Sequence, residues 1–191
     1  GKLASPKVTG DLGRGGGPKV MTAPGLHRRV KPFLYLVGPR ALGWLTRFWL
    51  PVGRRVVIIG GGFHGCEIAE FLVKRGRTVT ILEESAVVGK GVLDFRLGLL
   101  LDWFARRGVT VVVNAGDITI TAEGVSYTTS DGTRTIVTAD TVIPTAPVNP
   151  DRSLATALEA DVAEVYAIGD CVEAGMIVDA VAAGWRVAKQ I

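Results

Sequence analysis

Apolar and polar residues follow one another along the middle of the chain in a way that predicts strands and helices in turn. A continuous apolar run at 55–59 ends in a cluster of glycines, as expected of a strand that is buried on both faces of a parallel sheet. Residues 64–75 then place apolar side chains at helical spacing and stop at Gly76, which indicates an amphipathic helix. A second β-rich run follows at 78–82. The pattern therefore predicts a strand, a helix and a second strand joined by short turns.

The next stretch repeats this alternation. Asp94 can cap a second helix, whose apolar residues share one face and which stops at Gly108, and residues 109–113 are typical of a third strand. Three strands alternating with two helices form the mononucleotide-binding half of a doubly wound sheet.

Beyond this unit the pattern changes to short β-rich runs. Over residues 117–143, Gly124 and Gly132 each follow an acidic residue between alternating runs, which predicts an antiparallel meander. A last strand is expected at 165–168 and a last helix at 176–191. The predicted fold class is α/β, a Rossmann-like parallel sheet with an inserted antiparallel β-meander.

The N-terminal part has a different character. Residues 1–26 are rich in Gly, Pro, Lys and Thr, as in a connector, and residues 30–50 are apolar and aromatic. Pro39 can open a short helix that ends before Pro51. A basic, Trp-bearing helix is compatible with a membrane surface, but the Pro and Gly interruptions favour docking onto another part of a larger protein.

Charge and composition narrow the class of protein. Residues 1–55 carry eleven Lys and Arg against one acid, whereas the whole chain has a net charge of +4. A basic arm is compatible with nucleic-acid binding, but these bases are scattered and form no such motif, so no nucleic-acid partner is expected. No apolar run approaches the roughly 20 residues that span a bilayer, and the first residues lack a signal-peptide core. The two cysteines form no CxxC pair. The cytoplasm is the expected location.

The glycine cluster matches the dinucleotide-binding fingerprint GxGxxG. Gly60 would allow the tight turn, Gly62 would let a diphosphate approach the backbone, and Gly65 would let the helix pack closely on the sheet. The diphosphate would lie on N–H groups at the start of the helix, where the helix dipole is positive. The alternative is a tight strand-to-helix turn without a ligand. The predicted loop is Gly60, Gly61, Gly62, Phe63, His64 and Gly65.

An acidic residue ends the second predicted strand. Glu83 lies at the expected distance of about 20 residues beyond the glycines, where it would accept hydrogen bonds from the adenosine ribose. A 2′-phosphate would be repelled there, Glu84 adds a second negative charge, and Lys90 is the nearest base. These features predict NAD(H) rather than NADP(H). The alternative is that both acids are solvated loop residues.

The remaining candidates are weaker. His64 occupies a variable position of the motif and is expected to point outward rather than act in catalysis. Cys66 lies in the first helical turn, where a thiol pKa can fall, although a packed side chain is the better interpretation. No Ser-His-Asp arrangement and no cluster of metal ligands is present in the sequence. The prediction includes no catalytic residue and no metal site.

Two stretches carry a family resemblance. GGGFHGCEIAEFLVKRGRTVTILEE and VYAIGDCVEAGMIVDAVAAGWRVAKQI resemble the flavoproteins of the pyridine-nucleotide disulfide oxidoreductase superfamily. More closely, the chain looks like the C-terminal part of NADH:flavin oxidoreductases of the 2,4-dienoyl-CoA reductase and 2-enoate reductase type.

The resemblance implies further site residues. Gly169 and Asp170 match a late GD motif whose Asp contacts the ribityl-pyrophosphate part of FAD. Glu67 matches an acid near the nicotinamide, and Phe63 an aromatic position that can cover the nicotinamide pocket. In the family the NAD domain is inserted into the FAD domain. The expected organisation is a connector and docking helix of the FAD domain at 1–52, an NAD(H)-binding domain at 53–147, and a C-terminal FAD-domain segment at 148–191.

The departures from the family are equally informative. The first FAD fingerprint, the flavin-bearing barrel and the iron–sulfur cysteines are missing, so the chain is expected to be a piece of a larger enzyme. By resemblance the parent would use NADH, FAD, an iron–sulfur cluster and FMN to reduce an activated C=C bond. Its partner would be the remainder of its own polypeptide, the FAD lobe and the flavin barrel. Two alternatives remain open at this point, a flavin-free NAD-dependent dehydrogenase and a non-catalytic NAD-sensing or interaction domain.

Overall fold

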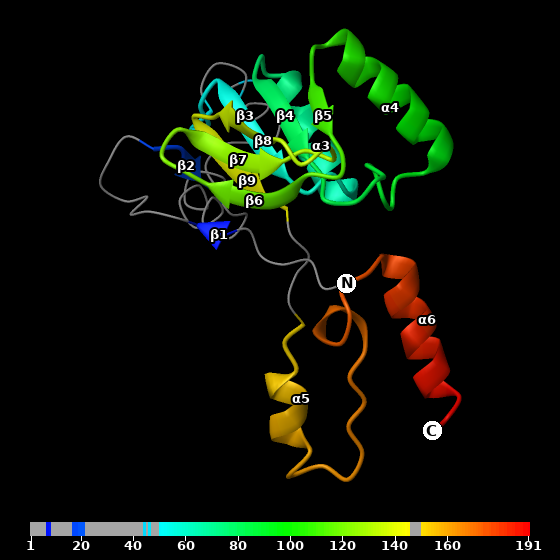
Figure 1. The fold of residues 1–191 in the computed structure, drawn as a ribbon. Helices are drawn as coiled ribbons and strands as arrows, with labels where there is room; N and C mark the ends of the chain where they lie inside the picture. Colours follow the sequence, from blue (N-terminus) through cyan, green and yellow to red (C-terminus); the bar gives the residue numbers. More distant parts are fainter. Residues whose placement is uncertain (1–6, 9–16, 22–43, 45, 47–49, 146–149) are drawn as a thin grey trace. The chain divides into compact units, whose positions relative to one another are not determined.

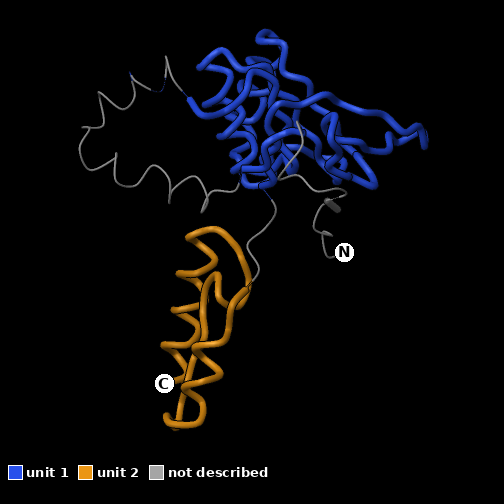
Figure 2. Tube along the Cα trace, turned by 90° about the vertical axis from the view of Figure 1, so that its left-hand side faces the viewer, with its two compact units in different colours: residues 1–146 blue, residues 147–191 orange. Residues whose placement is uncertain are grey.

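The structure is a computed structural model that describes residues 7–8, 17–21, 44, 46, 50–145 and 150–191. Its elements are drawn along the chain in Figure 1. The chain divides into two compact units, Gly1–Ala146 and Pro147–Ile191, which are coloured separately in Figure 2. Each unit is described by itself.

The first unit is built on a five-stranded sheet in which all neighbouring strands are parallel. The register places Ile59 opposite Leu82 on one side and Pro144 on the other. Three strands therefore end together at the point where the glycine turn begins. In spatial order the strands are β2 (Lys19–Val20), β9 (Thr141–Pro144), β3 (Arg55–Ile59), β4 (Thr78–Leu82) and β5 (Thr110–Val112).

Two helices connect the central strands. Helix α3 (Phe63–Val73) joins β3 to β4, and α4 (Asp94–Arg106) joins β4 to β5. The predicted βαβαβ unit is confirmed: β3 and β4 have the expected bounds, and α3 begins one residue earlier than expected. Helix α3 gives way to a turn at Gly76, where a φ of 71° is readily adopted only by a residue without a side chain.

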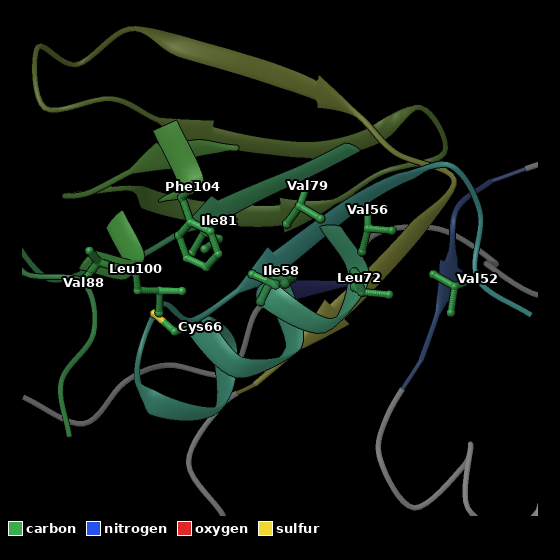
Figure 3. Packing of buried hydrophobic residues seen from close by; sticks show 11 residues of the cluster. Val52, Val56, Ile58, Cys66, Leu72, Val79, Ile81, Val88, Leu100 and Phe104 are labelled. Atoms are coloured by element: carbon green, nitrogen blue, oxygen red, sulfur yellow. The ribbon is translucent and has the colours of Figure 1, made fainter. Parts of the chain in front are cut away.

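Both faces of the parallel sheet are buried, which explains the continuous apolar run of β3. Val56 and Ile58 belong to a cluster that includes Leu72 of α3 and Phe104 of α4, part of which is shown in Figure 3. Val57 and Ile59 belong to a second cluster formed with the meander. Successive side chains of a strand point to opposite faces, so the four consecutive apolar residues divide between two cores. Each fully buried side chain of this kind contributes about 1.5–3 kcal/mol to the free energy of folding.

The predicted meander over residues 117–143 is confirmed as far as Thr138, whereas residues 141–143 form part of β9 in the parallel sheet, because they pair with β3. The meander consists of β6 (Gly116–Ile120), β7 (Gly124–Thr128) and β8 (Arg134–Thr138), which pair antiparallel. A Cβ at Gly124 would lie 2.0 Å from the carbonyl oxygen of Val137, so only glycine fits where β7 starts beside β8.

The N-terminal part contributes two strands that the sequence did not predict. Strand β1 (Lys7–Val8) pairs parallel with β6, and β2 pairs parallel with β9. The N–H of Lys19 donates to the carbonyl of Asp140 at 3.0 Å. Two-residue strands have no detectable periodicity, so only the partner strand specifies them. The helix expected between Pro39 and Pro51 falls mainly on residues outside those that the structure describes.

In the described part of the second unit, the regular elements are helical. They are α5 (Ser153–Leu158), the 3₁₀ turn η1 (Gly169–Cys171) and α6 (Ile177–Ala188). The predicted helix at 176–191 is confirmed with shorter bounds. The predicted strand at 165–168 is wrong, because the described part of this unit offers no strand to pair with it. None of the unit's described residues is buried.

Candidate functional site

The glycine turn begins where β3, β4 and β9 end. Gly60 has a φ of 102° and donates its N–H to the carbonyl of Leu82 at 2.8 Å. The hydroxyl of Thr145 donates to the Gly60 carbonyl at 2.8 Å, and a Cβ at Gly60 would lie 2.6 Å from that hydroxyl. Backbone conformation and crowding both require glycine here.

Gly61 is held on every side. Its N–H donates to Oε2 of Glu83 at 2.5 Å. Its carbonyl accepts hydrogen bonds from the N–H of Gly89 at 2.6 Å and from the Sγ of Cys66 at 3.4 Å. A Cβ at Gly61 would stand 2.6 Å from Cγ2 of Val88. Gly61 is therefore a packed residue of the turn and offers no free face to a ligand.

Gly65 and Gly62 differ in the space that a side chain would find beside them. A Cβ at Gly65 would lie 2.0 Å from the carbonyl oxygen of Gly60, so the helix approaches the turn closely. At Gly62 the nearest heavy atom would be the carbonyl oxygen of Lys90 at 3.7 Å. The turn is thus open at Gly62, the position where the fingerprint places the diphosphate.

The start of α3 supplies the hydrogen-bond donors. The first N–H groups of a helix have no acceptor within the helix, but the N–H of Phe63 donates to the carbonyl of Lys90 at 2.9 Å. In the described part of the chain, the N–H groups of Gly62, His64 and Gly65 have no hydrogen-bond acceptor. The predicted set of free amides is therefore smaller than the fingerprint alone implies.

Glu83 is fixed by the backbone around it. Its Oε1 accepts the N–H of Ser85 at 2.9 Å, while Oε2 accepts the N–H of Gly61. A carboxylate has about four lone-pair sites, so two remain for hydroxyl groups. Glu84 is exposed, and its pKa is raised by partial desolvation and, to a smaller extent, by the negative charge of Glu83.

Cys66 is a packed residue. Its side chain is fully buried, and burial together with the nearby charge of Glu83 raises the thiol pKa to about 11. The helix N-terminus does not overcome this desolvation, so the interpretation as an activated thiol is wrong and the packing interpretation is confirmed.

His64 and Glu67 are exposed on α3, as an outward-pointing His64 requires. The Phe63 and His64 rings meet edge to face with their centroids 5.6 Å apart. Within the described ranges, no group of three or more His, Cys, Asp or Glu is placed to hold a metal ion.

The late GD motif lies in the second unit. Gly169 has a φ of 73°, and Oδ1 of Asp170 accepts the N–H of Gly175 at 3.3 Å. Asp170 thereby closes the turn that precedes α6, and its carboxylate remains exposed.

Three features of the first unit escaped the sequence analysis. Thr145 braces Gly60, and residues 87–91 cross the turn. At the other end of β3, Arg55 forms an ion pair with Asp140 at 2.6 Å, whose hydrogen bonds lower the pKa of Asp140. The only sequence signal for any of these features was the pair of glycines that flank Lys90, which marks a turn within residues 87–91.

These features define a Rossmann-like domain with a braced glycine turn and an acid at the end of the next strand. The family model for pyridine nucleotide-disulphide oxidoreductases matches residues 11–188. The chain belongs to this family, whose members bind FAD and NAD(P)H.

Two similar proteins are named as oxidoreductases. The chain is 31% identical over 137 residues to an NADH oxidase from Thermoanaerobacter brockii. The matched region covers 71% of this chain and 21% of that protein. The chain is 29% identical over 143 residues to a cinnamate reductase from Clostridium sporogenes, covering 73% and 21%.

Solved structures show the same fold. A 2-naphthoyl-CoA reductase complex has a TM-score of 0.63 at 27% identity, covering 74% of this chain and 22% of that one. A histamine dehydrogenase from Rhizobium sp. 4-9 has a TM-score of 0.67 at 23% identity, covering 91% and 25%. The chain thus spans about a fifth to a quarter of these proteins. None of the described helices is long and apolar enough to cross a membrane.

Proposed function

We propose that this chain is the NADH-binding part of a larger FAD-dependent oxidoreductase. The observation that carries the proposal is the geometry of the glycine turn. Gly61 and Gly65 are closed by packing, Gly62 is open, and the Glu83 carboxylate is fixed one residue away from the opening. This arrangement suits a diphosphate on Gly62 and a ribose on Glu83.

Each group at the turn has a binding task. The N–H groups of Gly62 and His64 donate to the diphosphate, where the positive end of the α3 dipole favours negative charge. The free lone pairs of Glu83 accept from the ribose hydroxyls. By family resemblance, Phe63 and Glu67 lie on the nicotinamide side of the site.

Glu83 also sets the choice of nucleotide. A 2′-phosphate beside this carboxylate, with Glu84 next to it, meets like charge that NADH does not meet. NADH, when bound, would supply a hydride for the flavin, and the residues of the turn would orient it and stabilise its charge. No side chain of this chain is proposed as an acid or base.

The second unit is proposed as a segment of the FAD domain. Asp170 would contact the ribityl-pyrophosphate part of FAD, as the resemblance implies. Its helix α6 exposes Ile177, Val181 and Trp185, of which Ile177 is 87% exposed. A surface of this kind is expected to pack on the remainder of the same polypeptide, since the chain spans only about a fifth of its relatives.

The reaction of the complete protein is proposed to be reduction of an activated C=C bond. The names of two relatives, cinnamate reductase and 2-naphthoyl-CoA reductase, support a reductive enzyme of this type. An iron–sulfur cluster and FMN would belong to the part outside this chain, which alone would be inactive. The cytoplasm is the proposed location.

Two measurements test the proposal. Calorimetric titration of this chain should show NADH binding, and the purified complete polypeptide should show the visible absorbance of bound flavin. A chain that binds neither NADH nor NADPH would overturn the nucleotide site. A complete polypeptide that binds NADH without flavin would instead support the flavin-free dehydrogenase or the NAD-sensing domain.

A further inference from the structure

A loop that the fingerprint does not include lies across the glycine turn. This crossing loop, residues 87–91, is held by two backbone hydrogen bonds. The N–H of Gly89 donates to the Gly61 carbonyl at 2.6 Å, and the N–H of Phe63 donates to the Lys90 carbonyl at 2.9 Å. Val88 is buried near Leu100 in the same apolar cluster (Figure 3). The loop is thus a fixed part of the site.

The turn within the crossing loop fixes the place of Lys90. Gly89 and Gly91 have φ values of 80° and 93°, which residues with side chains rarely adopt. A Cβ at Gly89 would also lie 2.2 Å from Cδ1 of Leu97. Lys90 therefore starts from a defined backbone position at the first N–H of α3, beside the open face of Gly62.

The charge of Lys90 is uncompensated there. Lys90 is exposed, and within the described ranges no carboxylate forms an ion pair with it. The backbone of Lys90 adjoins the positive N-terminus of α3, and its flexible side chain carries a second positive charge. An anion placed between them is attracted by both. The described cations that do have a carboxylate partner are Arg55, Lys74, Arg96 and Arg106.

We propose that Lys90 is a nucleotide-binding residue whose ammonium group contacts the diphosphate of the bound dinucleotide, opposite the glycine turn. This inference rests on the proposed function. The backbone of Lys90 adjoins Gly62 and Phe63, whereas Glu83 is bonded to Gly61 and Ser85 at the ribose end. Lys90 accordingly acts on a charge that NADH and NADPH share, and it does not select between them.

The test compares Lys90→Gln, Lys90→Arg and the control Lys74→Gln in the full chain. Lys74 is an exposed lysine at the other end of α3, so its replacement makes the same change in net charge. Lys90→Gln should weaken the binding of NADH and of NADPH by the same factor, about tenfold. It should also make the binding affinity less dependent on salt concentration. Lys90→Arg and Lys74→Gln should stay within about twofold of the unmodified chain, because both lysine and arginine can pair with phosphate.

The outcomes separate this inference from the proposed function. Circular dichroism should show an unchanged fold for Lys90→Gln, because the anchoring hydrogen bond uses the backbone carbonyl. Unchanged NADH binding in that variant would overturn the role of Lys90 alone. A loss confined to NADPH would also overturn it, because Lys90 would then contact the 2′-phosphate. An unmodified chain that binds neither nucleotide would overturn both proposals.

Discussion

The carboxylate of Glu83 accepts a hydrogen bond from the N–H of Gly61 at 2.5 Å, so the acid of the predicted ribose site also holds the glycine turn in place. Hydrogen bonds to charged groups each contribute about 1.5–3 kcal/mol. Glu83 is therefore expected both to bind the ribose and to stabilise the glycine turn.

This double role leads to a prediction on nucleotide choice. The unmodified chain should bind NADH more tightly than NADPH, by about tenfold, which corresponds to about 1.4 kcal/mol. Glu83→Arg should narrow or reverse this difference and should lower the melting temperature, because Gly61 and Ser85 lose their acceptor. Calorimetry with both nucleotides and a thermal melt measure the two effects. Equal affinities in the unmodified chain would remove Glu83 from the account of specificity.

The glycines of the turn should separate into binding and folding positions. Gly62→Val should abolish nucleotide binding while the fold survives, because the space beside Gly62 is open to the ligand. Gly65→Ala should instead lower stability, since its Cβ would lie 2.0 Å from the Gly60 carbonyl oxygen. Circular dichroism and NADH titration distinguish the two variants. A folded Gly62→Val variant with normal NADH affinity would contradict the placement of the diphosphate.

The two cysteines should differ in reactivity. Cys66 is buried with a thiol pKa of about 11, whereas Cys171 is only partly buried. A thiol reagent near neutral pH should label Cys171 in the folded chain and Cys66 only after denaturation. Labelling followed by mass spectrometry of peptides checks this. Rapid modification of Cys66 in the folded chain would show that the helix N-terminus activates it after all.

The same thiol predicts a pH dependence of stability. The folded pKa of about 11 lies above the unfolded value of about 8.5. The contribution of Cys66 is therefore fully present below pH 8.5 and is lost as the pH rises through 11. Cys66→Ala should flatten this alkaline decline in the free energy of unfolding. An identical pH profile in the variant would show that another group titrates there.

Replacement of Asp170 should lower the binding of flavin and leave the binding of NADH nearly unchanged. Asp170→Ala should leave the NADH affinity of the chain within about twofold, because Asp170 belongs neither to the glycine turn nor to the strand end that carries Glu83. In the complete polypeptide the same change should lower FAD content, since an acceptor for the ribityl hydroxyls is lost. Flavin measured per protein decides this. Unchanged FAD with a lowered melting temperature would mean that Asp170 serves only to hold the N–H of Gly175.

The sequence by itself determined the order and type of the central elements. The apolar run of β3, the helical spacing of α3 and the glycine-punctuated strands of the meander are local patterns, because each reports which faces of one element are buried. The fingerprint glycines and Glu83 could also be identified, since each occupies a fixed position in a βαβ unit.

The tertiary structure alone decided which groups meet. Residues that are distant in sequence, such as Gly61 and Glu83 or Phe63 and Lys90, form hydrogen bonds only once the strands are in register. Burial of Cys66 depends on the packing of α3 against the sheet, and β2 exists only because β9 offers an edge to it. The run at 165–168 has strand-like residues but no partner strand among the described residues of its unit. Periodicity describes how one segment is exposed, whereas pairing and pKa depend on what the rest of the chain places beside it.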